Sequence, residues 1–131
     1  AALDQSGADG VMIGRGACGR PWFPANAIHF LATGERRADP PLETQMGIVL
    51  EHYDDMLVHY GVETGLRMAR KHLGWYAKGF PGAAEFRSTV MTLTEPEKVK
   101  DLVRAVWGRA IEAGCQPAND SGAVAGLKEA A

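Results

Sequence analysis

The sequence predicts a mainly α-helical protein, in which a four-helix bundle follows the remnant of the last strand and helix of a (β/α)8 barrel. Apolar residues recur at three- and four-residue intervals through the second half of the 131 residues, which is typical of amphipathic helices. Short connections rich in glycine and proline separate these stretches and favour antiparallel packing in a bundle. Near the start, a short apolar run ends in Gly14-Arg15-Gly16, as a buried parallel strand does before a phosphate-binding turn.

Residues 1–34 are predicted to be the C-terminal remnant of the barrel. They comprise the end of a helix at residues 1–6, a strand over 10–13 and a helix over 22–33, which stops at Gly34. A single strand leaves its backbone hydrogen-bonding groups unpaired, so self-association through its exposed edge is expected.

A polar linker, residues 35–41, precedes a predicted helical domain over residues 42–114. Its four helices are expected at residues 41–60, 62–78, 81–91 and 95–114. Thr94 and Glu97 have the spacing of a capping box, which predicts the N-terminus of the last helix. Residues 115–131 have little to bury and are predicted to be a mostly disordered tail.

The formal net charge of −2 gives no overall basic signal, so any surface for nucleic acid must come from local sorting of charge. No apolar run approaches the ~20 residues of a membrane span, and no signal peptide is visible. Cys18 and Cys115 lie far apart without metal-ligand spacing, and the four histidines show none either. We therefore expect a cytoplasmic protein with reduced thiols, no metal site and no membrane partner.

The turn Gly14-Arg15-Gly16 is a candidate phosphate site. Glycines let backbone N–H groups approach a phosphate closely, and the arginine can add a charged donor. Turns at the C-terminal ends of barrel strands often bind phosphate. The alternative is a tight turn without a ligand, because glycine-rich turns after strands are common.

A second candidate site lies on the helix predicted over residues 62–78. Its basic side chains share a face beside the apolar stripe, no acidic residue interrupts that face, and one arginine follows on the next helix. We call this set the basic strip: Arg67, Arg70, Lys71, Lys78 and Arg87. Such cations neutralise a phosphate backbone. Three rings interleave with them and can stack on an unpaired base, although the two larger ones are better explained as core or rim residues: His72, Trp75 and Tyr76. The alternative is a solvated face that keeps the bundle soluble.

Two stretches of the sequence resemble the tRNA-dihydrouridine synthase family. The first runs from Ala8 to Ala17, with Gly19, Pro21 and Trp22 after it, and is similar to the family's last barrel strand and FMN phosphate loop. The second is more specific and resembles the signature of the family's C-terminal helical domain: Arg67-Met68-Ala69-Arg70-Lys71-His72, Trp75-Tyr76, Lys78-Gly79, Pro81-Gly82 and Arg87. The likeness covers residues 1–114 and is greatest to the bacterial branch with this longer helical domain.

This resemblance implies an FMN-dependent, NADPH-driven enzyme that reduces uridine to dihydrouridine in tRNA. It implies that Gly14, Arg15 and Gly16 hold the FMN phosphate and that the basic strip contacts tRNA. Reduced flavin delivers hydride, and a cysteine on an upstream barrel loop supplies the proton, a role that we assign neither to Cys18 nor to Cys115. We therefore expect the C-terminal part of the enzyme, inactive alone and binding FMN weakly or not at all.

Two alternatives stay open. The chain is a helical protein-interaction module attached to an unrelated barrel flavoenzyme, in which case the basic strip contacts an acidic protein. A barrel flavoenzyme acting on small molecules is less well supported, because it gives the basic strip no role.

Overall fold

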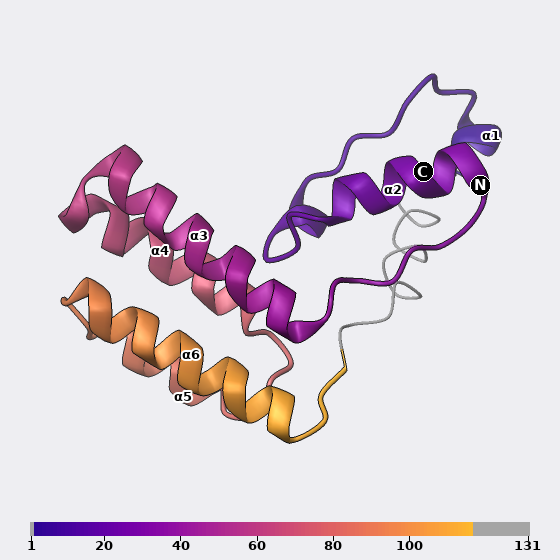
Figure 1. Ribbon diagram of the computed structural model, residues 1–131. Helices are drawn as coiled ribbons and strands as arrows, with labels where there is room; N and C mark the ends of the chain where they lie inside the picture. The colour runs from indigo at the N-terminus through magenta and orange to yellow at the C-terminus, as the bar shows by residue number, and fades with distance from the viewer. Residues whose placement is uncertain (1, 117–131) are drawn as a thin grey trace. The chain divides into compact units, whose positions relative to one another are not determined.

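The computed structural model describes residues 2–116, and these divide into two compact units between Asp39 and Pro40. The division lies within the segment predicted as a linker. All regular elements in this part of the chain are helices (Figure 1). Of the predicted tail, only Cys115 and Gln116 lie among the described residues. Across residues 2–116, no helix combines the length and the apolar character that crossing a membrane requires.

Residues 2–39, the described part of unit 1, contain two α-helices and a short 3-10 helix. They are α1 (Ala2–Ser6), η1 (Arg15–Ala17) and α2 (Phe23–Thr33). The strand predicted over residues 10–13 is wrong, since this segment forms no strand pairing. A strand exists through hydrogen bonds to a neighbouring strand, and residues 2–116 contain no second strand with which it pairs. The side chains of Val11 and Met12 are exposed instead, at 39% and 91%.

A buried ion pair ties the end of unit 1 to the residues just before α2. Arg20 donates hydrogen bonds to both carboxylate oxygens of Asp39, over 2.7 Å to Oδ1 and 3.1 Å to Oδ2, and the aspartate side chain is only 2% exposed. Asn26 donates to the same carboxylate at 3.3 Å, and the guanidinium lies 4.9 Å from the centre of the Phe23 ring. Two bonds between planar groups fix both side chains. The segment predicted as a linker is therefore anchored at Asp39.

Four helices make up unit 2. They are α3 (Leu42–Tyr60), α4 (Val62–Tyr76), α5 (Ala83–Val90) and α6 (Pro96–Glu112). α3 packs against α4 and α6, and α5 contacts the same two helices (Figure 1). The most deeply buried side chains of the apolar core are Val49, Tyr53, Leu73, Phe86, Val90, Val99, Val103, Val106 and Trp107. Many are three or four positions apart, which is the spacing that predicts these helices.

The backbones of α3 and α4 approach each other closely at Gly65. A Cβ atom there would lie 2.8 Å from the carbonyl oxygen of Met56 and 2.9 Å from Cα of Leu57, closer than Cβ atoms come to such neighbours. Only glycine fits at this crossing. The turn before it, at Gly61, has a φ of 81°, a conformation that glycine adopts without a Cβ clash. Two glycines thus fold α4 back onto α3.

α6 is joined to α3 by polar contacts near its N-terminus. The hydroxyl of Tyr53 donates to the carbonyl oxygen of Pro96 at 3.2 Å, and the Lys100 ammonium pairs with the Asp54 carboxylate at 2.7 Å. Burial raises the pKa of Tyr53 to about 12, and the negative charges of Asp54 and Glu97 contribute to this increase. The tyrosine therefore stays a hydrogen-bond donor at physiological pH.

The capping box predicted at Thr94 and Glu97 is wrong. α6 has Glu95 as its N-cap residue, and no side chain there forms a capping hydrogen bond. Proline favours the first helical position because it lacks an N–H group, so Pro96 sets the start of the helix and leaves Thr94 one residue too early. The Glu95 carboxylate instead pairs with Lys98 at 2.6 Å.

Candidate nucleic-acid interface

α4 has a buried face and an exposed face, and the basic strip lies on the exposed one. Its apolar positions, such as Leu73, are buried in unit 2, whereas Arg67 and Lys71 are exposed. Lys78 is exposed just beyond the helix, where its N–H donates to the carbonyl oxygen of Trp75 at 3.3 Å and so extends the last turn. At about 100° per residue, Arg67 and Lys71 fall within about 40° of each other around the helix.

Arg87 reaches the same face from α5. A Cβ atom at Gly74 would lie 3.3 Å from Cδ and 3.4 Å from Cγ of Arg87, so the arginine's alkyl chain lies directly over the α4 backbone. Around the helix, Gly74 stands between Arg70 and Arg67. The absent side chain therefore lets α4 and α5 contribute cations to one surface.

One acidic residue interrupts the strip, so the expectation of an uninterrupted basic face is wrong. Glu63 lies one turn before Arg67, and their carboxylate and guanidinium pair at 2.8 Å. The two side chains are 84% and 68% exposed, and an exposed pair of this spacing contributes only about 0.3–0.5 kcal/mol. Glu63 is the second residue of α4 and so belongs to the same helix as the strip. The four-residue spacing is the signal that reveals this pair.

Arg70 is half-buried and binds another part of unit 2. Its Nη2 donates to the carbonyl oxygen of Leu93, in the connection between α5 and α6, at 3.3 Å. Its Nε is buried and has no hydrogen-bond partner. Part of this guanidinium therefore holds the connection against α4, while Arg67 and Lys71 stay exposed.

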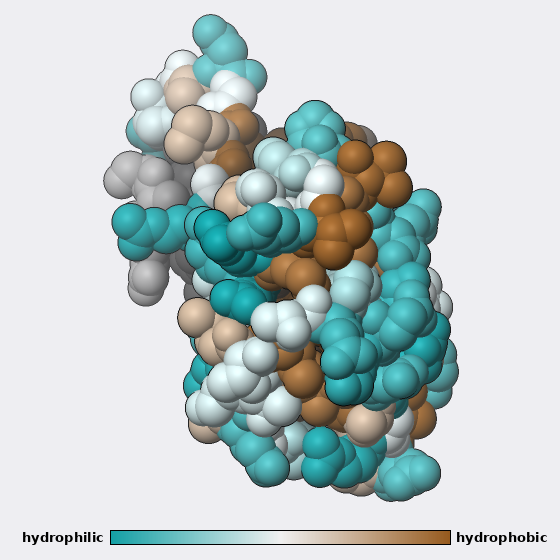
Figure 2. All heavy atoms as spheres, turned by 90° about the vertical axis from the view of Figure 1, so that its left-hand side faces the viewer, coloured by the Kyte–Doolittle hydropathy of each residue, from teal (hydrophilic) through white to brown (hydrophobic). Residues whose placement is uncertain are grey.

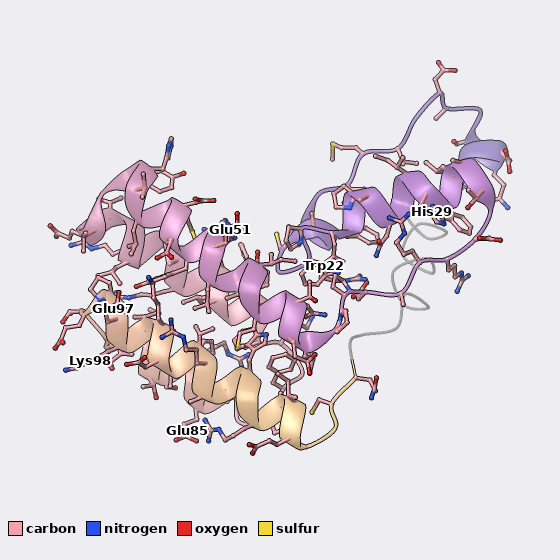
Figure 3. All side chains as sticks on the ribbon, in the orientation of Figure 1. Trp22, His29, Glu51, Glu85, Glu97 and Lys98 are labelled. Atoms are coloured by element: carbon pink, nitrogen blue, oxygen red, sulfur yellow. The ribbon has the colours of Figure 1, made fainter. Side chains whose placement is uncertain are left out.

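The cations on α6 differ from the strip in their partners. Three of its four are paired with carboxylates, at 2.6, 2.7 and 3.0 Å: Lys98 with Glu95, Lys100 with Asp54, and Arg104 with Asp101. Figure 3 shows Glu97 and Lys98 at the first turn of α6. Within residues 2–116, no carboxylate pairs with Lys71, Lys78 or Arg87. Their positive charge stays available to a ligand.

Aromatic rings adjoin Lys71. The rings of His72 and Trp75 stand edge-to-face with centroids 5.0 Å apart, and His72 lies 5.2 Å from His52 of α3. Nδ1 of His52 is 2.9 Å from the hydroxyl of Tyr76. The Lys71 ammonium lies 5.5 Å from the centre of the Trp75 ring. Tyr76 is buried, as predicted for a core residue, whereas Trp75 is 37% exposed and presents part of its ring to solvent.

Burial shifts the titration of two members of this ring cluster. The pKa of His72 is lowered below 6.5, chiefly by burial and further by His52 and Lys71. The pKa of Tyr76 is raised by burial to about 12. Both rings are therefore neutral at physiological pH, and the charge beside them comes from Lys71.

η1 carries the candidate phosphate turn. Its first hydrogen bond runs from the N–H of Ala17 to the carbonyl oxygen of Gly14 at 3.2 Å, so the N–H groups of Arg15 and Gly16 precede it and have no partner within the turn. A Cβ at Gly14 would meet nothing nearer than 4.0 Å, whereas one at Gly16 would lie 3.2 Å from the Phe23 ring. The open space at Gly14, the N–H groups of Arg15 and Gly16 and the exposed Arg15 side chain are together suited to binding an anion.

Apolar side chains reach the surface where α3 turns into α4. Val58, Tyr60 and Val62 are 86%, 46% and 56% exposed. Figure 2 looks onto this end of unit 2 and shows apolar groups among hydrophilic ones. These exposed apolar side chains are available for contact with another protein surface.

No metal or disulfide contributes to these sites within the described part of the chain. Cys18 and Cys115 carry free thiols. Residues 2–116 contain no group of three histidine, cysteine or acidic side chains that can hold a metal ion. His29 on α2 (Figure 3) instead contacts Arg37, whose Nη2 lies 3.1 Å from its Nδ1.

Comparison with known proteins gives one consistent result. The sequence model of the family described as dihydrouridine synthase matches residues 1–112. A probable tRNA-dihydrouridine synthase of Rickettsia bellii is 49% identical over 102 residues, which are 78% of this chain and 31% of the relative. The tRNA-dihydrouridine synthase B of Xanthomonas axonopodis pv. citri is 45% identical over 116 residues, or 88% and 35% of the two chains. The chain thus spans about a third of the length of these curated relatives.

Proposed function

Because this chain belongs to the dihydrouridine synthase family, we propose that it is part of an FMN-dependent tRNA-dihydrouridine synthase whose unit 2 binds tRNA through the basic strip. The observation that carries this proposal is the position of Arg87 over Gly74, which adds a cation from α5 to the cationic face of α4. Relatives named tRNA-dihydrouridine synthase support tRNA as the polyanion.

The strip is suited to a phosphate backbone more than to base sequence. Lys71, Lys78 and Arg87 have no carboxylate partner within residues 2–116, and their flexible stems let the charges follow a curved backbone. Lysine and arginine at phosphates give affinity and orientation without reading bases. The proposed role of unit 2 is to orient tRNA so that the target uridine leaves its stack and enters the catalytic site.

The turn in unit 1 is proposed to hold the FMN phosphate. The N–H groups of Arg15 and Gly16 would donate to phosphate oxygens, with the Arg15 guanidinium adding charge. When bound, FMN reduced by NADPH would supply hydride to the uracil ring. We expect the 131-residue chain alone to bind FMN weakly or not at all and to lack synthase activity, because phosphate contacts alone do not position a flavin. Flavin absorbance of the purified chain and dihydrouridine formation with NADPH test this.

A salt titration of tRNA binding tests the strip directly. On duplex nucleic acid, removing one cation from a phosphate lowers the magnitude of the slope of log affinity against log salt by about 0.9. We expect Lys78→Gln to weaken filter binding of tRNA and reduce the slope. The matched control, Lys98→Gln, removes the same charge from a lysine already paired with Glu95, and it should change the slope less. Equal slopes for both variants would contradict the proposal.

A protein-interaction module is the second candidate function. The exposed Val58, Tyr60 and Val62 favour it, because apolar groups of this kind contact protein surfaces more readily than phosphates. Competition separates the two candidate functions. Under the first, unlabelled bulk tRNA displaces a labelled tRNA from the chain. Under the second, an acidic protein binds to the chain and tRNA does not. Heparin controls for charge alone.

Two expectations about location and assembly stay proposals. A cytoplasmic location rests on tRNA as the substrate. Self-association would use the exposed side chains of Val11 and Met12. Sedimentation of Met12→Glu against the unchanged chain tests the second point.

A further inference from the structure

We propose that Trp75 is a stacking site for an unpaired RNA base at the edge of the basic strip. This inference rests on the proposed function of unit 2 and adds a contact that the cations do not supply. It is carried by the exposure of Trp75, by the rings that fix its orientation and by the lysine that lies over it.

Trp75 is exposed although it is one of the largest apolar side chains in unit 2. Its side chain stays 37% exposed, while Trp107 is fully buried. Lys71 precedes Trp75 by four residues, so both lie on the same side of α4. An indole beside unpaired cations offers the two groups that a single-stranded nucleic acid meets in turn, charge for the phosphate and a ring face for the base.

The indole is held in one orientation by a line of rings. His72 stands edge-to-face against it at 5.0 Å, with an angle of 86° between the ring planes. His72 in turn lies 5.2 Å from His52, whose Nδ1 is 2.9 Å from the hydroxyl of the buried Tyr76. Each ring restrains the next. The exposed ring at the end of this line therefore loses little freedom when a base stacks on it, which favours binding.

The ammonium of Lys71 lies over the indole ring of Trp75. It is 5.5 Å from the ring centre, a distance at which a cation and an aromatic face attract. A phosphate draws the ammonium toward itself, because a full negative charge attracts it more strongly than the ring does. That movement uncovers the face for the neighbouring base. A duplex brings the phosphate but keeps its bases stacked internally, so the site selects unpaired RNA.

Binding of two probes to the 131-residue chain tests this selection. The probes are a single-stranded oligouridylate and an RNA duplex with the same number of phosphates. Trp75→Leu should weaken binding of the single strand by about 5- to 150-fold, the range for losing one base–aromatic stack, and leave duplex binding unchanged. Trp75→Phe keeps a ring and should recover most of the affinity. Equal losses on both probes, or no loss on either, overturn the proposal.

Fluorescence provides a readout that does not depend on folding of the leucine variant. Oligouridylate should quench the emission of the unchanged chain more than the duplex does, and Trp75→Phe should abolish that difference. The same difference in Trp75→Phe would overturn the proposal. Failure of the parent proposal looks different: the unchanged chain then binds neither probe, and Lys78→Gln has no effect on tRNA.

Discussion

Arg87 of α5 lies across the backbone of α4 at Gly74, with its Cδ 3.3 Å from where a Cβ of residue 74 would stand. The Arg87 side chain can lie against α4 because Gly74 beneath it has no side chain. Through this contact, α4 and α5 contribute cations to the same surface. A substitution at Gly74 can displace the Arg87 side chain while leaving every cationic residue in place.

Substitution at Gly74 separates the effects of size and charge on the strip. Gly74→Gln and Gly74→Glu have nearly equal volume, and both displace the Arg87 stem. The glutamate also places a negative charge within the strip, so we expect tRNA to bind it about tenfold more weakly than the glutamine variant at low salt. The difference should shrink as salt screens it. Filter binding measures both, and equal affinities at low salt would contradict the placement of Gly74 within the tRNA-binding surface.

We expect an added methyl group at Gly65 to lower the free energy of unfolding of unit 2. Gly65→Ala places a Cβ 2.8 Å from the Met56 carbonyl oxygen, so the helices must separate, at about 1–3 kcal/mol of unfolding free energy. Gly47→Ala on α3 is the matched control, because a Cβ there meets nothing within 4 Å. It should be neutral or stabilising by up to about 1 kcal/mol. Urea unfolding of the two variants checks the contrast, and similar stabilities would disagree with the packing.

The helices of unit 2 could be predicted from sequence because their signals are local. Apolar spacing and terminal glycines predict helices over residues 41–60 and 62–78. The structure has α3 over 42–60 and α4 over 62–76. The strand over 10–13 could not be predicted in the same way, since a strand depends on distant hydrogen-bond partners that apolar character does not reveal. Gly65 was equally hidden, because its need for a glycine arises from α3.

Arg70 is expected to matter for stability. Its guanidinium donates to the carbonyl oxygen of Leu93, so Arg70→Met leaves that oxygen without this donor and frees the connection between α5 and α6. We expect a loss of about 1 kcal/mol, or about 4–8 °C in the melting temperature of a domain of this size. Arg104→Met serves as the control, since its pair with Asp101 is exposed and worth less. Equal melting temperatures for the two variants would contradict this role.

His72 predicts the direction of one pH dependence. Its pKa in the folded chain lies below 6.5, so the unfolded chain binds the proton first as the pH falls. The free energy of unfolding therefore decreases from pH 6.5 down to the folded-state pKa and levels off below it. His72→Gln should lose this part of the dependence. Urea unfolding at about pH 7.5 and about pH 5 compares the two chains, and identical pH dependence would argue against a half-buried, neutral imidazole at His72.

The candidate site was predictable in composition but not in arrangement. Helical spacing predicts a shared face for Arg67 and Lys71, which are both exposed on α4, and Lys78 is exposed just beyond the end of that helix. The same spacing reveals the pairing of Glu63 with Arg67 once Glu63 is included. The buried pair of Arg20 and Asp39 joins residues 19 positions apart, and no local pattern indicates it.

A comparison of two triple variants tests the central claim most directly. One neutralises the strip, as Lys71→Gln, Lys78→Gln and Arg87→Gln. The other removes the same charge from α6, as Lys98→Gln, Arg104→Gln and Arg109→Gln. If unit 2 docks on tRNA through α4 and α5, the first variant loses most of its affinity and salt dependence in filter binding, while the second keeps both. Equal losses in the two variants would show that net charge alone holds tRNA, and would contradict the account.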